Sequence, residues 1–174
     1  MLEPLGIVRI GKKIIMEMMS NSMVVKTPVG RIAIRVSDGR LSGIDFLITV
    51  VPEQAMPKDP MAREVLRQLT AYFRDPQRPF RLPLEMGGTE FQRRVWRALI
   101  QIPPGQVRSY GAVARQLESG PRAVGNACRC NPIPIVVPCH RVVSCRGMGG
   151  YAGETGGEKL QIKRWLLSHE GVAL

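Results

Sequence analysis

Aromatic residues, histidine and cysteine are all scarce in this chain of 174 residues: aromatics make up 5%, and there are two histidines and four cysteines. Four cysteines in a chain of this length do not suggest a disulfide framework, so we expect reduced thiols. No run approaches the ~18 apolar residues of a membrane span, and the first residues lack the pattern of a signal peptide. We therefore expect a cytoplasmic protein that does not bind a membrane.

Acidic residues are also few, with 14 Asp and Glu against 25 Lys and Arg and a net charge of +11. Hydrophobic residues make up 44%, which is enough to build a core, and the length allows one domain or two small ones. The excess positive charge attracts polyanions such as nucleic acid or an anionic membrane, and charge alone does not choose between them. Nine arginines, Arg141 among them, and two glutamates lie between Glu90 and Arg146, so we expect a basic surface in the second half, around the two short helices.

The first half predicts an antiparallel sheet followed by a helix. Residues 1–22 are rich in Met, and we assign them no role. Three strands separated by turns that contain Gly are predicted at 23–27, 31–36 and 41–49. Val65, Leu69 and Tyr72 then recur on one helical face, and Asp75-Pro76 ends that helix. A connector with Pro and Gly follows, so we predict an N-terminal domain over 23–85 and a C-terminal domain over 86–174.

The second half predicts several helices, two of them short and adjacent. Thr89 and Gln92 form a capping box for a helix that Pro103-Pro104-Gly105 ends. Ser109 is a suitable N-cap for a helix over 110–118, and a second helix over 122–129 follows the turn Ser119-Gly120-Pro121. This spacing is typical of a helix-turn-helix. With a last amphipathic helix over 159–169, the chain is predicted to be α+β.

The run Pro138-Cys139-His140-Arg141 is the strongest candidate for chemistry. The apolar residues 135–137 before it predict a buried thiol, and burial raises the pKa of a thiol, so a reactive Cys139 needs a base. His140 can take the proton directly or through water if a carboxylate orients its ring. Three carboxylates lie near enough in the sequence, and the sequence does not choose among them: Glu154, Glu158 and Glu170.

The other cysteines have a simpler interpretation. Cys128 and Cys130 are expected to be small residues packed at a helix end. The spacing of these two with Cys139 and Cys145 does not match the paired cysteines of zinc ribbons and fingers, so we expect no metal.

The run 131–143, which reads NPIPIVVPCHRVV, resembles the active-site signature of the O6-alkylguanine-DNA alkyltransferases, also called methylated-DNA–protein-cysteine methyltransferases. The resemblance covers 89–171 and is weaker over 23–84. It implies a ribonuclease H-like N-terminal domain and a winged-helix-like C-terminal domain. It also implies a DNA repair protein that flips an alkylated guanine out of double-stranded DNA and moves the alkyl group irreversibly to its own cysteine. No cofactor is implied, and we expect a monomer.

The resemblance also implies a role for individual residues. Cys139 matches the alkyl acceptor, His140 the water-linked base, and Glu170 the carboxylate that orients the base. Asn131 matches a residue that supports the turn before the acceptor, and Tyr110 a hydroxyl that hydrogen-bonds the leaving guanine oxygen. The loop between Gly153 and Lys159 is a few residues longer than is typical of the family.

Further positions match the family's pocket and its DNA-binding helix. The Val142 carbonyl is implied to read the guanine amino group, and Tyr151, Ala152 and Gly153 to form the pocket wall with Tyr110. The family usually has Ser at Ala152, but the donor there is a backbone N–H. Arg122 matches the finger that fills the gap left by the flipped base. The small residues after Arg122 allow a close approach to a minor groove. The expected DNA contacts are Arg122, Ala123, Gly125, Ser109 and Arg129.

Three other functions fit parts of the sequence. A transcription factor can use the same helix pair, but it does not need Pro-Cys-His-Arg. An alkyltransferase-like damage sensor binds alkylguanine, but such proteins lack the acceptor cysteine. A Cys-His hydrolase requires an oxyanion hole, for which the sequence holds no signal.

Overall fold

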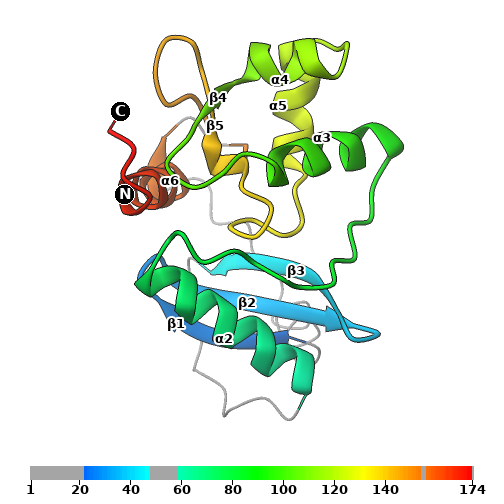
Figure 1. Ribbon diagram of the computed structural model, residues 1–174, viewed down its shortest axis with the longest axis vertical. Coiled ribbons are helices and arrows are strands. Elements are labelled where there is room, and N and C mark those ends of the chain that lie inside the picture. Colours follow the sequence, from blue (N-terminus) through cyan, green and yellow to red (C-terminus); the bar gives the residue numbers. More distant parts are fainter. Residues whose placement is uncertain (1–21, 48–58, 154–155, 174) are drawn as a thin grey trace, which may run out of the picture.

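The computed structural model describes residues 22–47, 59–153 and 156–173, which form two domains stacked along the long axis (Figure 1). The N-terminal domain is a sheet with one helix, and the C-terminal domain is mainly helical, so the predicted α+β class is confirmed. Of the Met-rich segment, only Ser22 is among the described residues. The end of the third predicted strand, at Thr49, also lies outside them.

The N-terminal sheet is an antiparallel meander in the order β1-β2-β3. Its strands are β1 (Ser22–Thr27), β2 (Gly30–Ser37) and β3 (Arg40–Leu47). Gly30 and Gly39 close the two hairpins with φ of 101° and 69°, a backbone conformation that favours glycine. The predicted strands are therefore confirmed to within a few residues.

Helix α2 (Pro60–Arg74) packs on one face of this sheet. It begins where Asp59 accepts a hydrogen bond from the Ala62 amide at 2.9 Å, with Pro60 at its first position. The predicted apolar face is buried: Val65, Leu69 and Tyr72 are each at most 1% exposed. This packing places Tyr72 beneath the second domain, within hydrogen-bond distance of Glu170.

The C-terminal domain contains α3 (Glu90–Ile100), α4 (Tyr110–Gln116), α5 (Pro121–Arg129) and α6 (Gly157–His169). The capping box predicted at Thr89 and Gln92 is present, and Ser109 accepts from the Ala112 amide at 3.1 Å as the predicted N-cap of α4. The short strands β4 (Arg108–Ser109) and β5 (Val142–Val143) pair in parallel beside the predicted helix pair. Between α5 and β5 lies the short 3-10 turn η1 (Cys139–Arg141).

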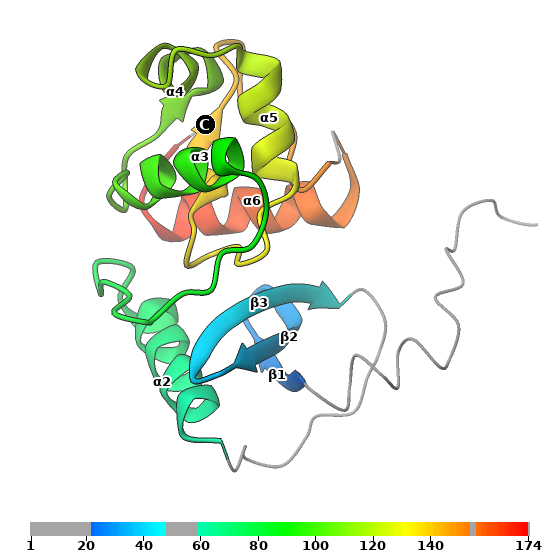
Figure 2. The ribbon, with the colours of Figure 1, turned by 90° about the vertical axis from the view of Figure 1, so that its right-hand side faces the viewer.

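The two domains share one hydrophobic core. A single cluster of buried side chains runs from Met23 in the sheet to Leu166 in α6. At the junction, the Ile44 amide of β3 donates to the Pro132 carbonyl at 2.9 Å, next to the turn that precedes Cys139. In both ribbon views the loop between α5 and β5 lies next to β3 (Figures 1 and 2). The N-terminal domain therefore supports the segment that carries the candidate nucleophile. Among the described residues, no helix has the length and apolar character needed to cross a membrane.

The indole of Trp96 connects α3 to α5, so a substitution at Trp96 tests how these two helices pack. Trp96 is 2% exposed, and its Nε1 donates to the Ala127 carbonyl at 2.9 Å. We expect Trp96→Phe to lower the free energy of unfolding by about 2 kcal/mol, because a buried carbonyl loses its partner and volume is lost. Urea denaturation measures the loss. The neighbouring exposed Arg97→Lys change should alter stability by less than about 0.5 kcal/mol, and equal effects of the two would contradict this packing role.

Candidate active site

Cys139 lies in a turn that Asn131 holds in shape. The Asn131 Oδ1 accepts from the Ile133 amide at 3.0 Å, and its Nδ2 donates to the Val137 carbonyl at 2.8 Å. The same Nδ2 lies 3.1 Å from the Cys139 sulfur. One amide side chain thus fixes the backbone on both sides of the turn and also contacts the thiol. The supporting role that the resemblance implied for Asn131 fits this geometry.

The Cys139 thiol is buried, as the apolar run before it predicted, with 4% of its surface exposed. Burial raises the pKa of Cys139, while the Asn131 amide, the Lys163 ammonium and the Tyr151 hydroxyl each act to lower it. Because burial is the largest of these effects, the thiol is neutral near pH 7. A reaction that uses the thiolate therefore needs a base close by.

His140 is the candidate for that base. Its side chain is fully buried, and its Nε2 lies 2.9 Å from Oε1 of Glu170. Burial lowers the pKa of His140, and the charges of Arg141 and Lys163 lower it further, against the effect of Glu170. The imidazole is thus neutral near pH 7, with its proton on Nε2 toward the carboxylate. Its Nδ1 is buried and has no hydrogen-bond partner within the described part of the chain, so it is free to accept a proton.

Glu170 is the carboxylate that the structure brings to the base. It follows α6 directly and is 4% exposed. Burial alone would raise the pKa of Glu170, but hydrogen bonds from His140 and Arg141 lower it to about 2. Of the two other carboxylates considered, Glu158 is exposed at the start of α6, and Glu154 lies outside the described residues. The longer loop before α6 does not displace Glu170 from His140.

A cavity of about 320 Å³ opens beside Cys139. It is lined by Tyr110, Gly125, Asn126, Cys128, Arg129, Cys139, Gly150, Tyr151, Ala152 and Gly153. Most of the predicted pocket residues are thus gathered around one space. Gly149, with φ of 68°, allows the loop to pass close to Tyr110, because a side chain there would lie 3.2 Å from the ring.

Two polar groups of the predicted pocket, the Tyr110 hydroxyl and the Val142 carbonyl, already have hydrogen-bond partners within the protein. The Tyr110 hydroxyl donates to the Gly150 carbonyl at 3.2 Å, so this hydroxyl must turn to meet a ligand. The Val142 carbonyl does not line the cavity, and it accepts from the Lys163 ammonium at 2.7 Å. A carbonyl has two lone pairs, so one remains for a second donor.

Lys163 is a buried charged residue next to the candidate site, and sequence reasoning did not single it out. Its ammonium group is buried and donates to the carbonyls of Val142, Met148 and Gly150 at 2.7, 2.7 and 3.0 Å. Burial lowers the pKa of Lys163 to about 8, so the group remains mostly charged at pH 7. Lys163 thereby connects α6 to the loop that contains Met148 and Gly150. It also places a positive charge near both Cys128 and Cys139. Its spacing from Leu160 and Leu166 on the apolar face was the available signal.

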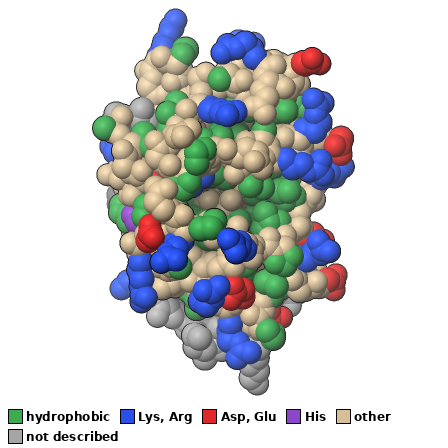
Figure 3. All heavy atoms as spheres, viewed as in Figure 1, with side chains coloured by type: hydrophobic (Ala, Val, Ile, Leu, Met, Phe, Trp, Pro, Cys, Tyr) green, Lys and Arg blue, Asp and Glu red, His purple; other side chains and the backbone are tan. Residues whose placement is uncertain are grey.

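Helix α5 joins the cavity to an exposed, basic surface. Arg122 and Ala123 are exposed at its beginning, and Gly125 is half-buried against the Tyr110 ring. Ser109 is partly buried as the cap of α4, and Arg129 is exposed and donates to Asn126 at 3.2 Å. Lys and Arg side chains outnumber acidic ones on the face that Figure 3 shows, over both domains.

Arg141 was counted with this basic surface, and that assignment is wrong. Its guanidinium is buried, 6% exposed, and donates to Glu170 from Nε at 2.9 Å and from Nη2 at 2.8 Å. A third bond runs from Nη1 to the Ile102 carbonyl at 2.5 Å. The charge on Arg141 is therefore neutralised inside the protein and does not face a polyanion.

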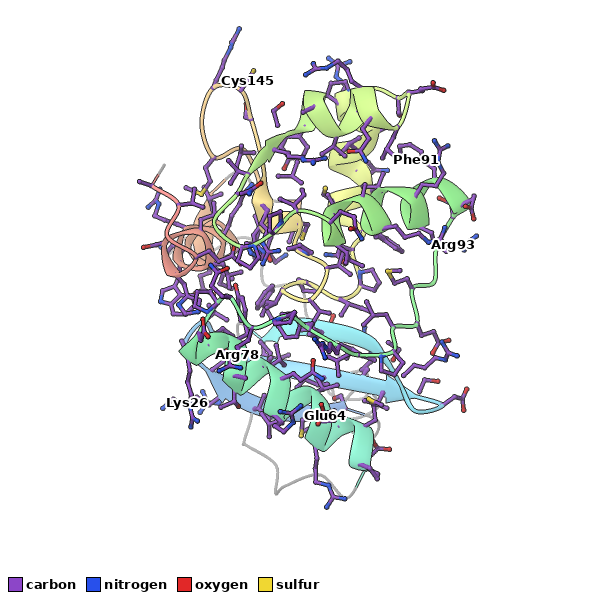
Figure 4. All side chains as sticks on the ribbon, in the orientation of Figure 1. Lys26, Glu64, Arg78, Phe91, Arg93 and Cys145 are labelled. Atoms are coloured by element: carbon purple, nitrogen blue, oxygen red, sulfur yellow. The ribbon has the colours of Figure 1, made fainter. Side chains whose placement is uncertain are left out.

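The cysteines also depart from expectation in one respect. Cys128 is buried at the end of α5, as predicted, but it also lines the cavity, whereas Cys130 is exposed and so is not a packed residue. Cys145 is exposed on the loop after β5, away from the domain junction (Figure 4). No group of three or more metal-ligating side chains occurs in the described ranges.

The fold and site together define a two-domain protein in which a helix-turn-helix adjoins a cavity with a buried cysteine, and the histidine that follows this cysteine in the chain is bonded to a buried carboxylate. Comparisons with known families agree with this class. The family model described as "6-O-methylguanine DNA methyltransferase, DNA binding domain" matches residues 90–172, and the "ribonuclease-like domain" of the same methyltransferase matches residues 22–86. The chain belongs to the methylated-DNA–protein-cysteine methyltransferase family.

Individual relatives support this membership. The chain is 38% identical over 155 residues to the methylated-DNA–protein-cysteine methyltransferase of Methanosarcina acetivorans, which covers 85% of this chain and 96% of that protein. It is 36% identical over 159 residues to the constitutive enzyme of Bacillus subtilis, covering 85% and 93%. It is 54% identical to the Shigella flexneri methyltransferase over 96 residues, about half of each chain.

Solved structures show the same architecture. The O6-methylguanine methyltransferase of Mycobacterium tuberculosis superposes with a TM-score of 0.72 at 35% identity, covering 88% of this chain and 94% of that one. The structure of the same bacterium's protein in complex with DNA gives a TM-score of 0.73 at 38% identity, covering 86% and 92%.

The electrostatic role of Lys163 leads to a pH prediction. We expect Lys163→Met to move the pH dependence of Cys139 alkylation by iodoacetamide to higher pH, because a positive charge that favours the thiolate is removed. The exposed neighbour Arg164→Met is the matched control and should leave the profile in place. Thiol reactivity that follows the same pH curve in both variants and the unmodified protein would contradict this role.

Proposed function

We propose that this protein repairs DNA by transferring the alkyl group of O6-alkylguanine to its own Cys139. The observation that carries the proposal is the arrangement around that sulfur. Cys139 lies at the wall of a cavity, with the neutral His140 beside it in the chain and Glu170 bonded to the far side of that imidazole. Family membership supports the same reaction.

The proposed reaction uses side chains of this protein and one water molecule. The Cys139 proton passes to His140 Nδ1 through a water molecule, and the resulting imidazolium is stabilised by Glu170. The thiolate then attacks the alkyl carbon, a carbon–sulfur bond forms, and the bond from that carbon to guanine O6 breaks. The departing guanine takes up the proton that the imidazolium gives back through water, with Tyr110 proposed as the hydroxyl that meets the departing oxygen. The thioether product is stable in water, so each molecule reacts once.

The proposed partner is double-stranded DNA that contains alkylated guanine. The small residues at the exposed beginning of α5 suit a close approach to a minor groove, and Arg122 is the long side chain there that can occupy the space of a flipped base. Flipping costs a few kcal/mol, and least for a mispaired base, which favours damaged sites. The surrounding arginines supply affinity for phosphates. We also propose that the protein acts in the cytoplasm and as a monomer.

The central test of this function removes the acceptor. We expect Cys139→Ala to leave O6-methylguanine intact in duplex DNA, while the unmodified protein converts it to guanine in an amount equal to the protein present. Digestion of the DNA and chromatography of its nucleosides measure the conversion. The control Cys128→Ala removes another cavity thiol and should retain transfer. Methyl removal by Cys139→Ala, with the adduct on Cys128, Cys130 or Cys145, would contradict the proposal.

A second prediction concerns Arg122. Because it is expected to act only on duplex DNA, Arg122→Ala should slow repair of methylated duplex by about tenfold or more while leaving the reaction with free O6-benzylguanine within about twofold. Arg40→Ala, at an exposed turn of the N-terminal sheet, is the charge-matched control and should affect neither reaction. Equal losses on duplex and free base would count against a role in flipping.

A further inference from the structure

We propose that Tyr72, on α2 of the N-terminal domain, is a positioning residue for the candidate active site, acting through Glu170 on His140. This inference rests on the proposed function, and it assigns the N-terminal domain a direct part in the chemistry. It identifies no contact between Tyr72 and the substrate.

The contacts of Tyr72 are specific and buried. Its side chain is 1% exposed, and its hydroxyl donates to Oε1 of Glu170 at 2.7 Å. The Tyr72 carbonyl also lies 2.9 Å from Nε2 of His169, the residue before Glu170. Side chain and backbone of one residue thus hold two successive residues at the end of α6, and these residues are almost 100 positions away in the sequence.

The oxygen that Tyr72 contacts is also the oxygen that serves the base. Oε1 of Glu170 accepts from His140 Nε2 at 2.9 Å and from Arg141 Nη2 at 2.8 Å. Three donors therefore share one carboxylate oxygen, and a change in one of them alters the other two. Tyr72 fixes where that oxygen lies, and so fixes the orientation of the imidazole ring.

The same contact affects the proton affinity of His140. The charged groups that act on His140 are Lys163 from α6, Glu170 directly after α6, and Arg141 from η1. The neutral Tyr72 hydroxyl contacts the Glu170 carboxylate from α2. Glu170 raises the pKa of His140, whereas burial and the two cations lower it. The Tyr72 hydroxyl draws negative charge from Oε1. Removing that hydroxyl leaves more negative charge facing the imidazole, so the pKa of His140 should rise.

The expected rise in the His140 pKa determines how the rate of transfer should change with pH. A base works in its neutral form, so a higher pKa of His140 means that the base is lost at a higher pH. Without the hydroxyl the carboxylate is also less well fixed. We therefore expect Tyr72→Phe to slow transfer and to move the acid limb of the pH–rate profile to higher pH.

Tyr72→Phe is a suitable variant because it retains the packing of the ring. The Tyr72 ring lies against Phe73, Phe80 and His169, with centroids 5.5, 5.3 and 5.4 Å away. A phenyl ring keeps these contacts. The matched control is Phe73→Leu, which disturbs the same aromatic cluster, including the contact of Phe73 with Trp165, without removing a donor to Glu170.

The experiment measures single-turnover transfer from free O6-benzylguanine across pH, so that DNA binding does not enter. We expect Tyr72→Phe to lower the rate at neutral pH by about tenfold and to move the acid limb upward by roughly half a unit or more. Phe73→Leu should keep the acid limb of the unmodified protein. An unchanged rate and profile in Tyr72→Phe would overturn the inference. A slower rate with an unmoved acid limb would overturn it too, because that is the signature of a structural role alone.

A second readout separates this inference from the proposed function. An NMR titration of the His140 ring in the unmodified full-length protein and in Tyr72→Phe needs no alkyl transfer. We expect the His140 pKa to be higher in the variant, and an equal or lower value would overturn the inference. A failure of the unmodified protein to accept any alkyl group would instead contradict the proposed function, and the titration would still decide the role of Tyr72.

Discussion

One buried carboxylate organises this protein. Glu170 accepts hydrogen bonds from Tyr72 in the N-terminal domain and from His140 and Arg141 in the turn that carries Cys139. The charge on this carboxylate compensates the buried guanidinium, and loss of one partner of such a pair costs about 3–5 kcal/mol. The carboxylate that contacts the proposed base is therefore also one of the contacts between the two domains.

The pH range of this interaction follows from the pKa of Glu170. That pKa is lowered from 4.5 to about 2, so the carboxylate is more acidic in the folded protein than in the unfolded chain. Its charge contributes stability in full above the unfolded value, and this contribution is lost as the pH falls from there through the folded value. Near neutral pH the network is fully formed, and the neutral imidazole is ready to accept a proton.

Burial also explains how a reactive cysteine can be kept unreactive until it is needed. Desolvation holds Cys139 in its thiol form, while Asn131, Lys163 and Tyr151 favour the thiolate once a base removes the proton. In the proposed reaction the thiolate thus forms at the cavity wall, where Cys139 is 4% exposed. A protein whose acceptor can be used once benefits from this arrangement, because an exposed thiolate would react with any electrophile.

Much of the fold and part of the site could be predicted from local sequence. Caps and periodic apolar faces depend on neighbours, so Thr89, Ser109 and the face of α2 were identified correctly. The turn around Cys139 was recognisable because its residues are contiguous, and Glu170 was among the carboxylates considered.

What escaped prediction depends on long-range contacts. A buried charged side chain has the same letter as a solvated one, so Arg141 was misassigned to the basic surface and Lys163 was not recognised. Tyr72 was identified as a core residue, but its hydroxyl meets a partner 98 positions away, and no local pattern shows that.

The most direct test of the account is the mass of the intact protein after incubation with an excess of duplex DNA containing O6-methylguanine. We expect every chain to gain the mass of a single methyl group in place of a hydrogen and no more, and peptide mapping to place the gain on Cys139. An unchanged mass with DNA that nevertheless loses its methyl groups, or a gain on any other residue, would contradict it.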